Sequence, residues 1–195
     1  MVTMTPSPRQ LLVLALGFAA VLALPGCGGG AKADFTGAAK LPSGYKTFKG
    51  AGVTFAYPGG WQVEQTTGAD GAPTVQIVPA DRTRTPYGLV QLSISPKAAD
   101  RFQNLADQRR VVIKTVNDGK IDSDGPVDIP GARKALMAKT TTPPQRGSDP
   151  VEVKASSLDV LRDNGDVVML TAAAPQRDGG GLDPDAVVSS FRIGG

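Results

Sequence analysis

The sequence predicts an α+β domain, a mainly antiparallel β-sheet flanked by helices, and three observations support this fold class. Segments in which apolar and polar residues alternate, as in half-buried strands, recur from residue 53 onward. Clusters of Gly, Pro, Asn and Asp separate these segments, and strands joined by such short turns are antiparallel. Two other stretches, 96–117 and 183–191, have the residue pattern of helices that could cover the sheet.

The first half of the domain is predicted to contain four strands. Val53, Phe55 and Tyr57 share one face of the first strand, and Trp61 and Val63 share one side of the second. The four strands are expected at 53–57, 61–65, 75–78 and 89–94. Turn clusters at 58–60, 68–71 and 86–88 precede the second, third and fourth strands.

A long helix is predicted over 96–117. Its apolar residues recur at helical spacing, which is typical of an amphipathic helix with one face on a core. They are Phe102, Leu105, Val112 and Val116. Gly119 follows the helix and is expected to take the left-handed conformation of a C-cap.

The second half of the domain is predicted to contain further strands and a short closing helix. Strands are expected at 127–129, 134–138, 151–162 and 166–172, with a polar surface loop at 140–150. Asn164-Gly165 joins the last two strands and favours a type I′ hairpin turn, in which both residues have positive φ. Asp183 is the expected N-cap of the closing helix and Pro184 its first residue. Val187, Val188 and Phe191 would then face the core.

The N-terminal segment has the layout of a secretory signal. Residues 1–10 are mostly polar and include Arg9, whereas 11–22 is an almost unbroken apolar run, too short for a membrane-spanning helix. Residues 24–27, Leu-Pro-Gly-Cys, resemble the bacterial lipobox, with proline in place of the usual small residue. This resemblance implies that Cys27 is lipidated, whereas the alternative is an ordinary cleaved signal that leaves Cys27 as a spare thiol.

The lipobox resemblance defines the expected organisation of the chain. Residues 1–26 are expected to be a lipoprotein signal peptide, 27–43 a lipidated flexible tether, and 44–195 one globular domain. A diacylglyceryl group on Cys27 would supply two acyl chains, enough for stable membrane anchoring. We therefore expect the domain at the outer face of the bacterial cytoplasmic membrane, within the cell envelope.

Composition excludes several classes of function. The 21 Lys and Arg nearly balance the 18 Asp and Glu, and no run of basic residues is longer than a pair such as Arg109-Arg110, so we expect no nucleic-acid partner. The chain has no histidine, which excludes Ser-His-Asp triads, Cys-His pairs and histidine-ligated zinc. Asp chemistry and Ser-Lys pairs stay open. No cofactor or metal site is expected.

Two acidic patterns are interpreted as structural. Glu64 and Glu152, the only glutamates, lie at outward positions of predicted strands, so we do not expect a glycosidase pair. Residues 122–125, Asp-Ser-Asp-Gly, match part of a calcium loop. Its first and twelfth ligand positions hold Lys120 and Gly131, so we expect a solvated turn.

Four residues are candidates for binding. Tyr57 and Trp61 could line a cleft for a lipid or an aromatic ligand, although aromatic residues beside a Pro-Gly-Gly turn also commonly pack in a core. Arg109 and Arg110 could bind acidic headgroups or a protein partner, although an exposed pair is commonly just a solvated helix face.

Two further motifs resemble those of the PsbP-like family. Residues 52–61 read Gly-Val-Thr-Phe-Ala-Tyr-Pro-Gly-Gly-Trp, and 187–192 read Val-Val-Ser-Ser-Phe-Arg. They are similar to that family's opening strand and closing helix, and the actinobacterial secreted lipoproteins of the LpqN-like group are the most similar members. The resemblance implies a PsbP-like α/β/α sandwich over 44–195 and an accessory or binding role. It supplies no catalytic, metal or cofactor residues.

Three functions are therefore expected, in order of preference. The first is a non-enzymatic envelope lipoprotein that serves as an accessory or binding module for another envelope protein. The second is a carrier of an apolar or lipid ligand, which would need an apolar cavity of roughly 300 Å³ or more between sheet and helix. The third is a hydrolase that uses Asp or Ser-Lys chemistry.

Overall fold

The computed structural model describes residues 35, 40–67, 72–83, 86–116, 118–144, 150–177 and 181–194. Cys27, the predicted signal peptide, most of the predicted tether and the turn cluster 68–71 lie outside the described residues. Among the helices that the structure describes, none has the length and apolar character needed to cross a bilayer.

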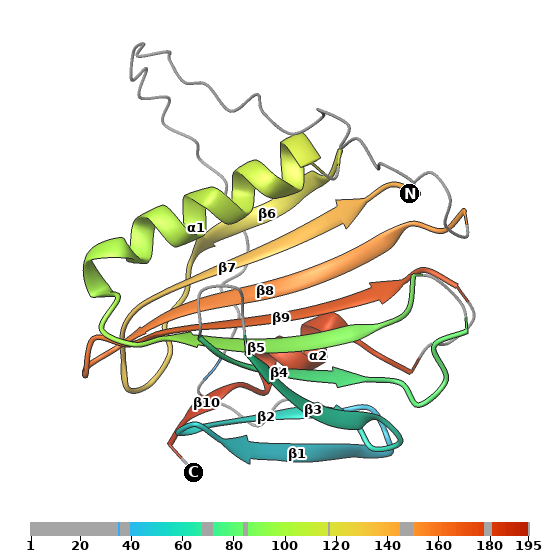
Figure 1. Ribbon diagram of the computed structural model, residues 1–195, viewed down its shortest axis with the longest axis horizontal. Helices are drawn as coiled ribbons and strands as arrows, with labels where there is room; N and C mark the ends of the chain where they lie inside the picture. The colour runs from blue at the N-terminus through green and yellow to red at the C-terminus, as the bar shows by residue number, and fades with distance from the viewer. Residues whose placement is uncertain are drawn as a thin grey trace, which may run out of the picture. The chain divides into compact units, whose positions relative to one another are not determined.

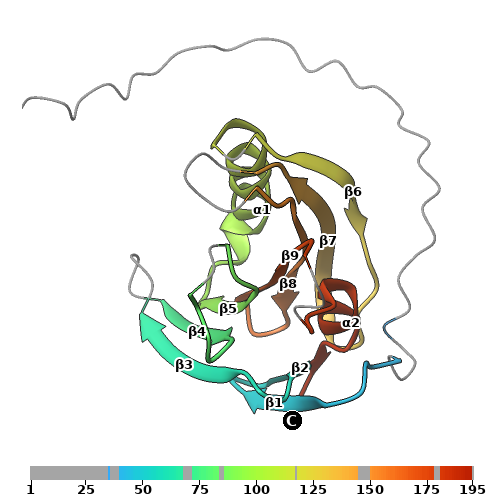
Figure 2. The same cartoon turned by 90° about the vertical axis from the view of Figure 1, so that its right-hand side faces the viewer.

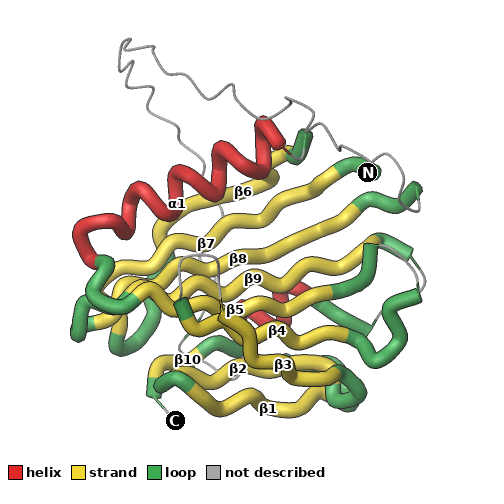
Figure 3. The backbone as a smooth tube through the Cα atoms, in the orientation of Figure 1, coloured by secondary structure: helices red, strands yellow, loops and turns green. Residues whose placement is uncertain are grey.

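A seven-stranded antiparallel sheet forms the centre of the α+β domain (Figure 1). Its strands lie in the order β3-β4-β5-β9-β8-β7-β6. Their bounds are Gln62–Thr67 for β3, Pro73–Val78 for β4, Leu89–Ser95 for β5, Lys120–Pro126 for β6, Ala132–Thr142 for β7, Val153–Arg162 for β8 and Val167–Pro175 for β9. Figure 3 shows how far strands outweigh helices along the chain.

A smaller antiparallel sheet is formed by strands from both ends of the domain. Its order is β1-β2-β10, with β1 at Tyr45–Gly50, β2 at Val53–Pro58 and β10 at Arg192–Ile193. The end of the chain thus returns to the first predicted strand, and Arg192 pairs with Thr54.

The two helices cover opposite faces of the large sheet (Figure 2). A single 3₁₀ turn, Ala99–Arg101, leads into α1 at Phe102–Val111, and a π-helical turn, Val112–Val116, follows. α2 spans Pro184–Ser189 and lies with the small sheet on the other face. Alternation along β8 shows the division, because Asp159 contacts α1 whereas Ser156 contacts α2.

The main core lies between the large sheet, α2 and the small sheet. Phe55 of β2, Leu158 of β8 and Leu170 of β9 pack there with the closing segment. Val187, Val188 and Phe191 are fully buried in this core, as predicted, and Asp183 caps α2 as predicted. A smaller cluster beneath α1 contains Ala98, Phe102, Leu161 and Val167.

The long helix differs from its prediction at the C-terminal end. Phe102 is buried and Leu105 packs against the smaller cluster, as the spacing predicted. Val112, however, is 47% exposed, because the backbone turns from α-helical to π-helical there and the 3.6-residue pattern no longer holds. The prediction that Gly119 takes the left-handed conformation was also wrong. Asp118 takes that conformation instead, with φ 52°.

Two short segments have a different secondary structure from the one predicted. The predicted strand 127–129 is a loop, because Pro126 and Pro130 flank it and Pro130-Gly131 form the turn closed by a hydrogen bond from Ala132 N to Ile129 O. The predicted turn 122–125 instead lies within strand β6. It stays at the sheet edge, where Asp122 and Asp124 are exposed to solvent.

The hairpin β8–β9 is confirmed, but its turn type is corrected. Gly165 has φ 86°, whereas Asn164 does not have positive φ. Gly165 N donates to Arg162 O at 3.0 Å, and Arg162 N donates to Asp166 O at 2.9 Å. These bonds close a three-residue loop, a type I turn followed by one left-handed glycine.

Phe35 extends the core beyond the expected domain boundary. It lies within the segment 27–43 that we expected to be a tether, yet it is 1% exposed and belongs to the main core. The folded domain therefore draws a core residue from nine positions before Gly44.

Candidate binding pocket

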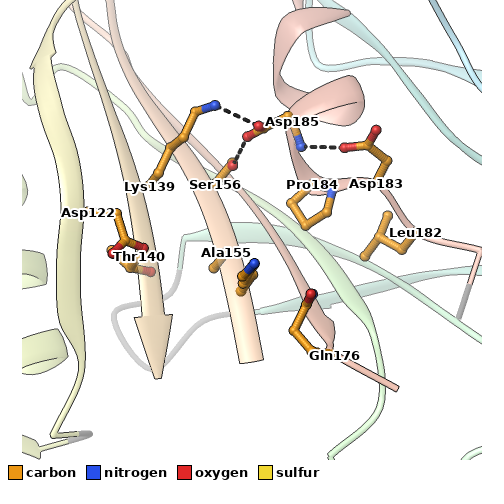
Figure 4. Close-up of a pocket in the computed structure, with 11 residues that line it drawn as sticks. Asp122, Lys139, Thr140, Ala155, Ser156, Gln176, Leu182, Asp183, Pro184 and Asp185 are labelled. Atoms are coloured by element: carbon orange, nitrogen blue, oxygen red, sulfur yellow. Dashed lines mark hydrogen bonds and ion pairs between the residues drawn. The ribbon is translucent and has the colours of Figure 1, made fainter. Parts of the chain in front are cut away.

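A pocket of about 450 Å³ lies where the start of α2 meets β7 and β8 (Figure 4). We call it the α2 pocket. Its lining is mixed, with charged, amide, hydroxyl and apolar groups. The lining residues are Asp122, Lys139, Thr140, Lys154, Ala155, Ser156, Gln176, Leu182, Asp183, Pro184 and Asp185.

Asp185 connects α2 to the sheet in this pocket. Lys139 of β7 and Ser156 of β8 are opposite each other in the sheet register, so both side chains reach the same carboxylate. Lys139 Nζ lies 2.6 Å from Asp185 Oδ2, and Ser156 Oγ donates to Asp185 Oδ1. Figure 4 shows both side chains pointing toward Asp185.

The electrostatics of Asp185 follow from these contacts. Partial burial raises the pKa of the carboxyl, but the hydrogen bonds from Lys139 and Ser156 outweigh burial and hold the pKa below its ordinary value. Asp185 is therefore ionised at neutral pH. Its position in the first turn of α2 is also where a negative charge stabilises a helix.

Asp183 completes the ordered start of α2. Its Oδ1 accepts the backbone N–H groups of Asp185 at 3.0 Å and Ala186 at 3.1 Å. Tyr45 of the small sheet accepts the N–H of Asp183 and donates to Gly181 O, at 2.7 and 2.9 Å. The wall of the α2 pocket is thus fixed from the helix, the large sheet and the small sheet.

The Lys139-Ser156-Asp185 group brings together the residue types of the Ser-Lys hypothesis. Ser156 is only 2% exposed and directs its hydroxyl at a carboxylate whose lowered pKa makes it a weak base. A nucleophile needs an accessible oxygen and a base matched to the working pH. The arrangement thus fits a structural connection between α2 and the sheet.

Asp122 reaches the rim of the same pocket from β6. It accepts a hydrogen bond from Thr141 at 2.6 Å and pairs with Lys120 at 3.2 Å. The hydrogen bond from Thr141 lowers the pKa of Asp122. No group of three or more potential metal ligands occurs among the residues that the structure describes.

Tyr57 and Trp61 lie away from the α2 pocket. Both are half-buried and pack against the main core, which favours the packing interpretation over an exposed cleft. The indole of Trp61 covers Gly88, where an added Cβ would come within 2.5 Å of the ring. Gly88 is therefore needed for this close approach.

Arg109 and Arg110 connect α1 to the sheet. Arg110 Nε lies 2.7 Å from Asp124 Oδ2, and a second nitrogen of the same guanidinium lies 2.6 Å from Asp107. Arg109 pairs with Asp159, whose side chain is 1% exposed. Both arginines are therefore ion-paired with aspartates and are not simply solvated.

The Arg109–Asp159 pair is buried but incompletely satisfied. Arg109 Nε and Asp159 Oδ2 have no partner among the described residues. Burial raises the pKa of Asp159, and the nearby Arg109 charge only partly offsets the effect. Because both charges are removed from water, the pair beneath α1 adds little to the free energy of unfolding.

The sequence did not single out Lys139, Ser156 or Asp185. Asp185 alone had a local signal, because it follows a predicted N-cap and Pro184. Lys139 and Ser156 become neighbours only through the β7–β8 register, which the sequence alone did not provide. Cys27, the predicted lipidation site, lies outside the described residues.

Comparisons with known proteins complete the description. No protein-family model matches the chain, and no curated protein matches it. A solved structure of a Pseudomonas aeruginosa protein of unknown function is similar, with a TM-score of 0.40 and 15% identity over 69% of this chain and 85% of that one. A Bacteroides thetaiotaomicron structure has a TM-score of 0.45 and 13% identity over 77% of this chain and 48% of that one.

Proposed function

We propose that the protein is a lipid-anchored lipoprotein of the bacterial cell envelope, with a PsbP-like domain that binds another envelope protein without catalysis. The anchor part of the proposal is supported by the apolar run at 11–22 and the lipobox-like residues that end at Cys27. The domain would lie at the outer face of the cytoplasmic membrane.

The binding part is supported chiefly by the α2 pocket. Its wall is held in place by the Lys139–Asp185–Ser156 contacts, so the pocket exists before anything binds. Its rim offers the exposed side chains of Lys154 and Gln176 beside the partly exposed Leu182. A rim with charged, amide and apolar groups suits a polypeptide segment better than a hydrocarbon chain.

The anchor is tested with Cys27→Ser. We expect the wild-type chain in the membrane fraction with an acyl mass on its first residue, and the variant released or unprocessed. Membrane retention of the variant equal to that of the wild type would contradict lipidation.

The binding surface is tested by photo-cross-linking in intact cells. A photoreactive residue at Lys154, on the pocket rim, should yield one discrete protein adduct, and the same residue at Lys49, exposed on β1, should not. Gln176→Arg, which changes an exposed side chain of the same lining, should remove the adduct while leaving the thermal melt unchanged. Equal adducts at both positions would exclude the pocket as the binding surface.

A second candidate function is carriage of an apolar ligand. A pocket of about 590 Å³ lies between the start of α1 and β7. Its lining combines apolar residues such as Phe102, Val127 and Leu136 with the charged Asp128, Arg133 and Lys134. Native mass spectrometry of the protein extracted from its own membrane distinguishes the two functions. A retained lipid would favour the carrier, and a retained protein the binding module.

A further inference from the structure

The four sheet edges of the domain are not equally protected against pairing with another strand. A free edge presents unpaired N–H and C=O groups, and proteins usually protect it with lysine, proline, charge or a bulge. β6 carries three charged side chains, a register shift and a terminal Pro126. β1 carries the exposed Lys46 and Lys49, and β10 has only two residues.

β3 carries only one of these protections, a single charge. Its sequence, Gln-Val-Glu-Gln-Thr-Thr, contains no lysine or proline, and it pairs with β4 without a register shift. The charged residue, Glu64, forms an ion pair with Arg82 of the same chain. Val63 is 42% exposed on this strand. β3 forms one of the two edges of the large sheet, opposite the β6 edge (Figure 2).

We propose that the free edge of β3 pairs with β3 of a second copy of this chain, antiparallel and across a two-fold axis. The two large sheets would then form one continuous sheet. Such an interface is isologous, so each residue must be compatible with its own image or with a nearby position of the same strand. This inference is independent of the α2 pocket.

The geometry of antiparallel strands fixes the register. Residues directly opposite each other share a face of the sheet, and faces alternate along the strand, so the two-fold axis must pass through a residue. An axis through Glu64 would set two carboxylates face to face, which is unfavourable. An axis through Gln65 pairs Gln65 with itself, Glu64 with Thr66, and Val63 with Thr67.

The register centred on Gln65 satisfies both conditions that the strand imposes. It sets no like charges opposite each other, and it keeps the whole overlap, residues 63–67, within β3. An axis through Val63 would bring Trp61, outside the strand, into the pairing, and an axis through Thr66 would shorten the overlap. Val63, exposed in one copy, becomes a cross-strand neighbour of Thr67 in the other.

Disulfide cross-linking of the full chain tests this register. Opposite residues in an antiparallel pair have Cα atoms roughly 4.5–5.5 Å apart, within disulfide range. Under mild oxidation in the cell fraction that holds the protein, Gln65→Cys should give a disulfide dimer of twice the chain mass. We expect about tenfold more dimer than from Thr47→Cys, on the exposed β1 edge, or Thr66→Cys, on the other face of β3, because only residue 65 meets its own image within disulfide range.

A second variant separates pairing from misfolding, and the parent chain with Cys27 alone sets the background. Val63→Lys combined with Gln65→Cys should reduce the dimer to the Thr47→Cys level, because an edge lysine opposes strand addition, while the thermal melt stays unchanged. Equal cross-linking of Gln65→Cys and Thr47→Cys would overturn the proposal. So would equal cross-linking of Thr66→Cys, a Val63→Lys variant that still cross-links, or a product of another mass.

Discussion

Asp185 acts at the residue scale as the connection between a short helix and a sheet. A six-residue helix has little stability of its own, so its position depends on side-chain contacts. The carboxylate of Asp185 meets Lys139 and Ser156, and its backbone N–H meets Asp183. One residue therefore fixes α2 at both its side chain and its main chain.

Asp185→Asn should destabilise the domain at neutral pH and matter less in acid. The folded pKa of Asp185 is lowered, so its stabilisation is present above the unfolded pKa and is lost as the pH falls through the folded pKa. Since the side chain is 51% exposed, we expect only about 1 kcal/mol at pH 7. Urea unfolding at neutral and acidic pH measures the difference. A pH-independent loss would show that charge is not involved.

Trp61→Ala tests whether the tryptophan packs or binds. The indole packs on Gly88 and the main core, so truncation should cost about 3 kcal/mol, at the lower end for large aromatic residues because the ring is only half-buried. Tyr87→Ala, at a 39% exposed aromatic residue next to Gly88, is the control and should change little. A Trp61→Ala melt equal to the wild type would favour an exposed binding role.

At the scale of elements, α1 and α2 are held in different ways. α2 is buried through Ala186, Val187 and Val188, whereas α1 buries only Phe102 and Ala106 fully and adds the Arg109–Asp159 pair. A buried ion pair with unpartnered atoms contributes little net stability. α1 is therefore the less firmly attached helix.

Asp159→Asn should show the opposite pH behaviour to Asp185→Asn. The folded pKa of Asp159 is raised, so the folded state holds the proton more tightly, and the stability of the wild type falls as the pH rises from the unfolded pKa through the folded one. The variant lacks this fall. Its free energy of unfolding should therefore gain on the wild type as the pH rises over the range above the ordinary pKa of an aspartate. A constant difference across that range would contradict the raised pKa.

The β8–β9 turn gives a prediction about backbone conformation. Gly165 alone has positive φ there, so Gly165→Ala should cost about 1–2 kcal/mol. Gly60→Ala is the matched control, because Gly60 lacks positive φ and an added Cβ would meet nothing within 4 Å. Equal effects on the thermal melt would contradict the turn assignment.

The elements show which parts of the structure the sequence could predict. Alternation located β2, in which Val53 and Phe55 are buried on one face, the Asn164-Gly165 turn located the β8–β9 hairpin, and the Asp183-Pro184 start located α2. Alternation did not locate β6, because nearly all residues of this strand are exposed to solvent and no apolar face marks it. The α2 pocket could not be predicted, because Lys139, Ser156 and Asp185 meet only through strand register and the final fold of the chain.

At the scale of the whole molecule, Phe35 joins the N-terminal part of the chain to the core. It is 1% exposed and packs in the cluster that holds Phe55 and Phe191. Composition could not reveal this, because Phe35 stands alone among Gly, Ala and Lys. A single large side chain can be buried without any periodic pattern around it.

Phe35→Ala should therefore destabilise the entire domain, by about 3–5 kcal/mol if the cavity does not collapse. Leu41→Ala, at a 42% exposed position in the same part of the chain, is the control and should have little effect. Urea unfolding measures both. Equal stability of the Phe35→Ala variant and the wild type would place the start of the folded domain near Gly44 after all.

The burial of Phe35 also limits how far from the bilayer the domain could work. If Cys27 carries the acyl chains, Phe35 lies eight positions after it, and a fully extended chain over eight steps reaches only about 28 Å. A tether running on to Gly44 would have reached about 60 Å. The part of the domain around Phe35 would then stay within the shorter of these two distances from the membrane surface.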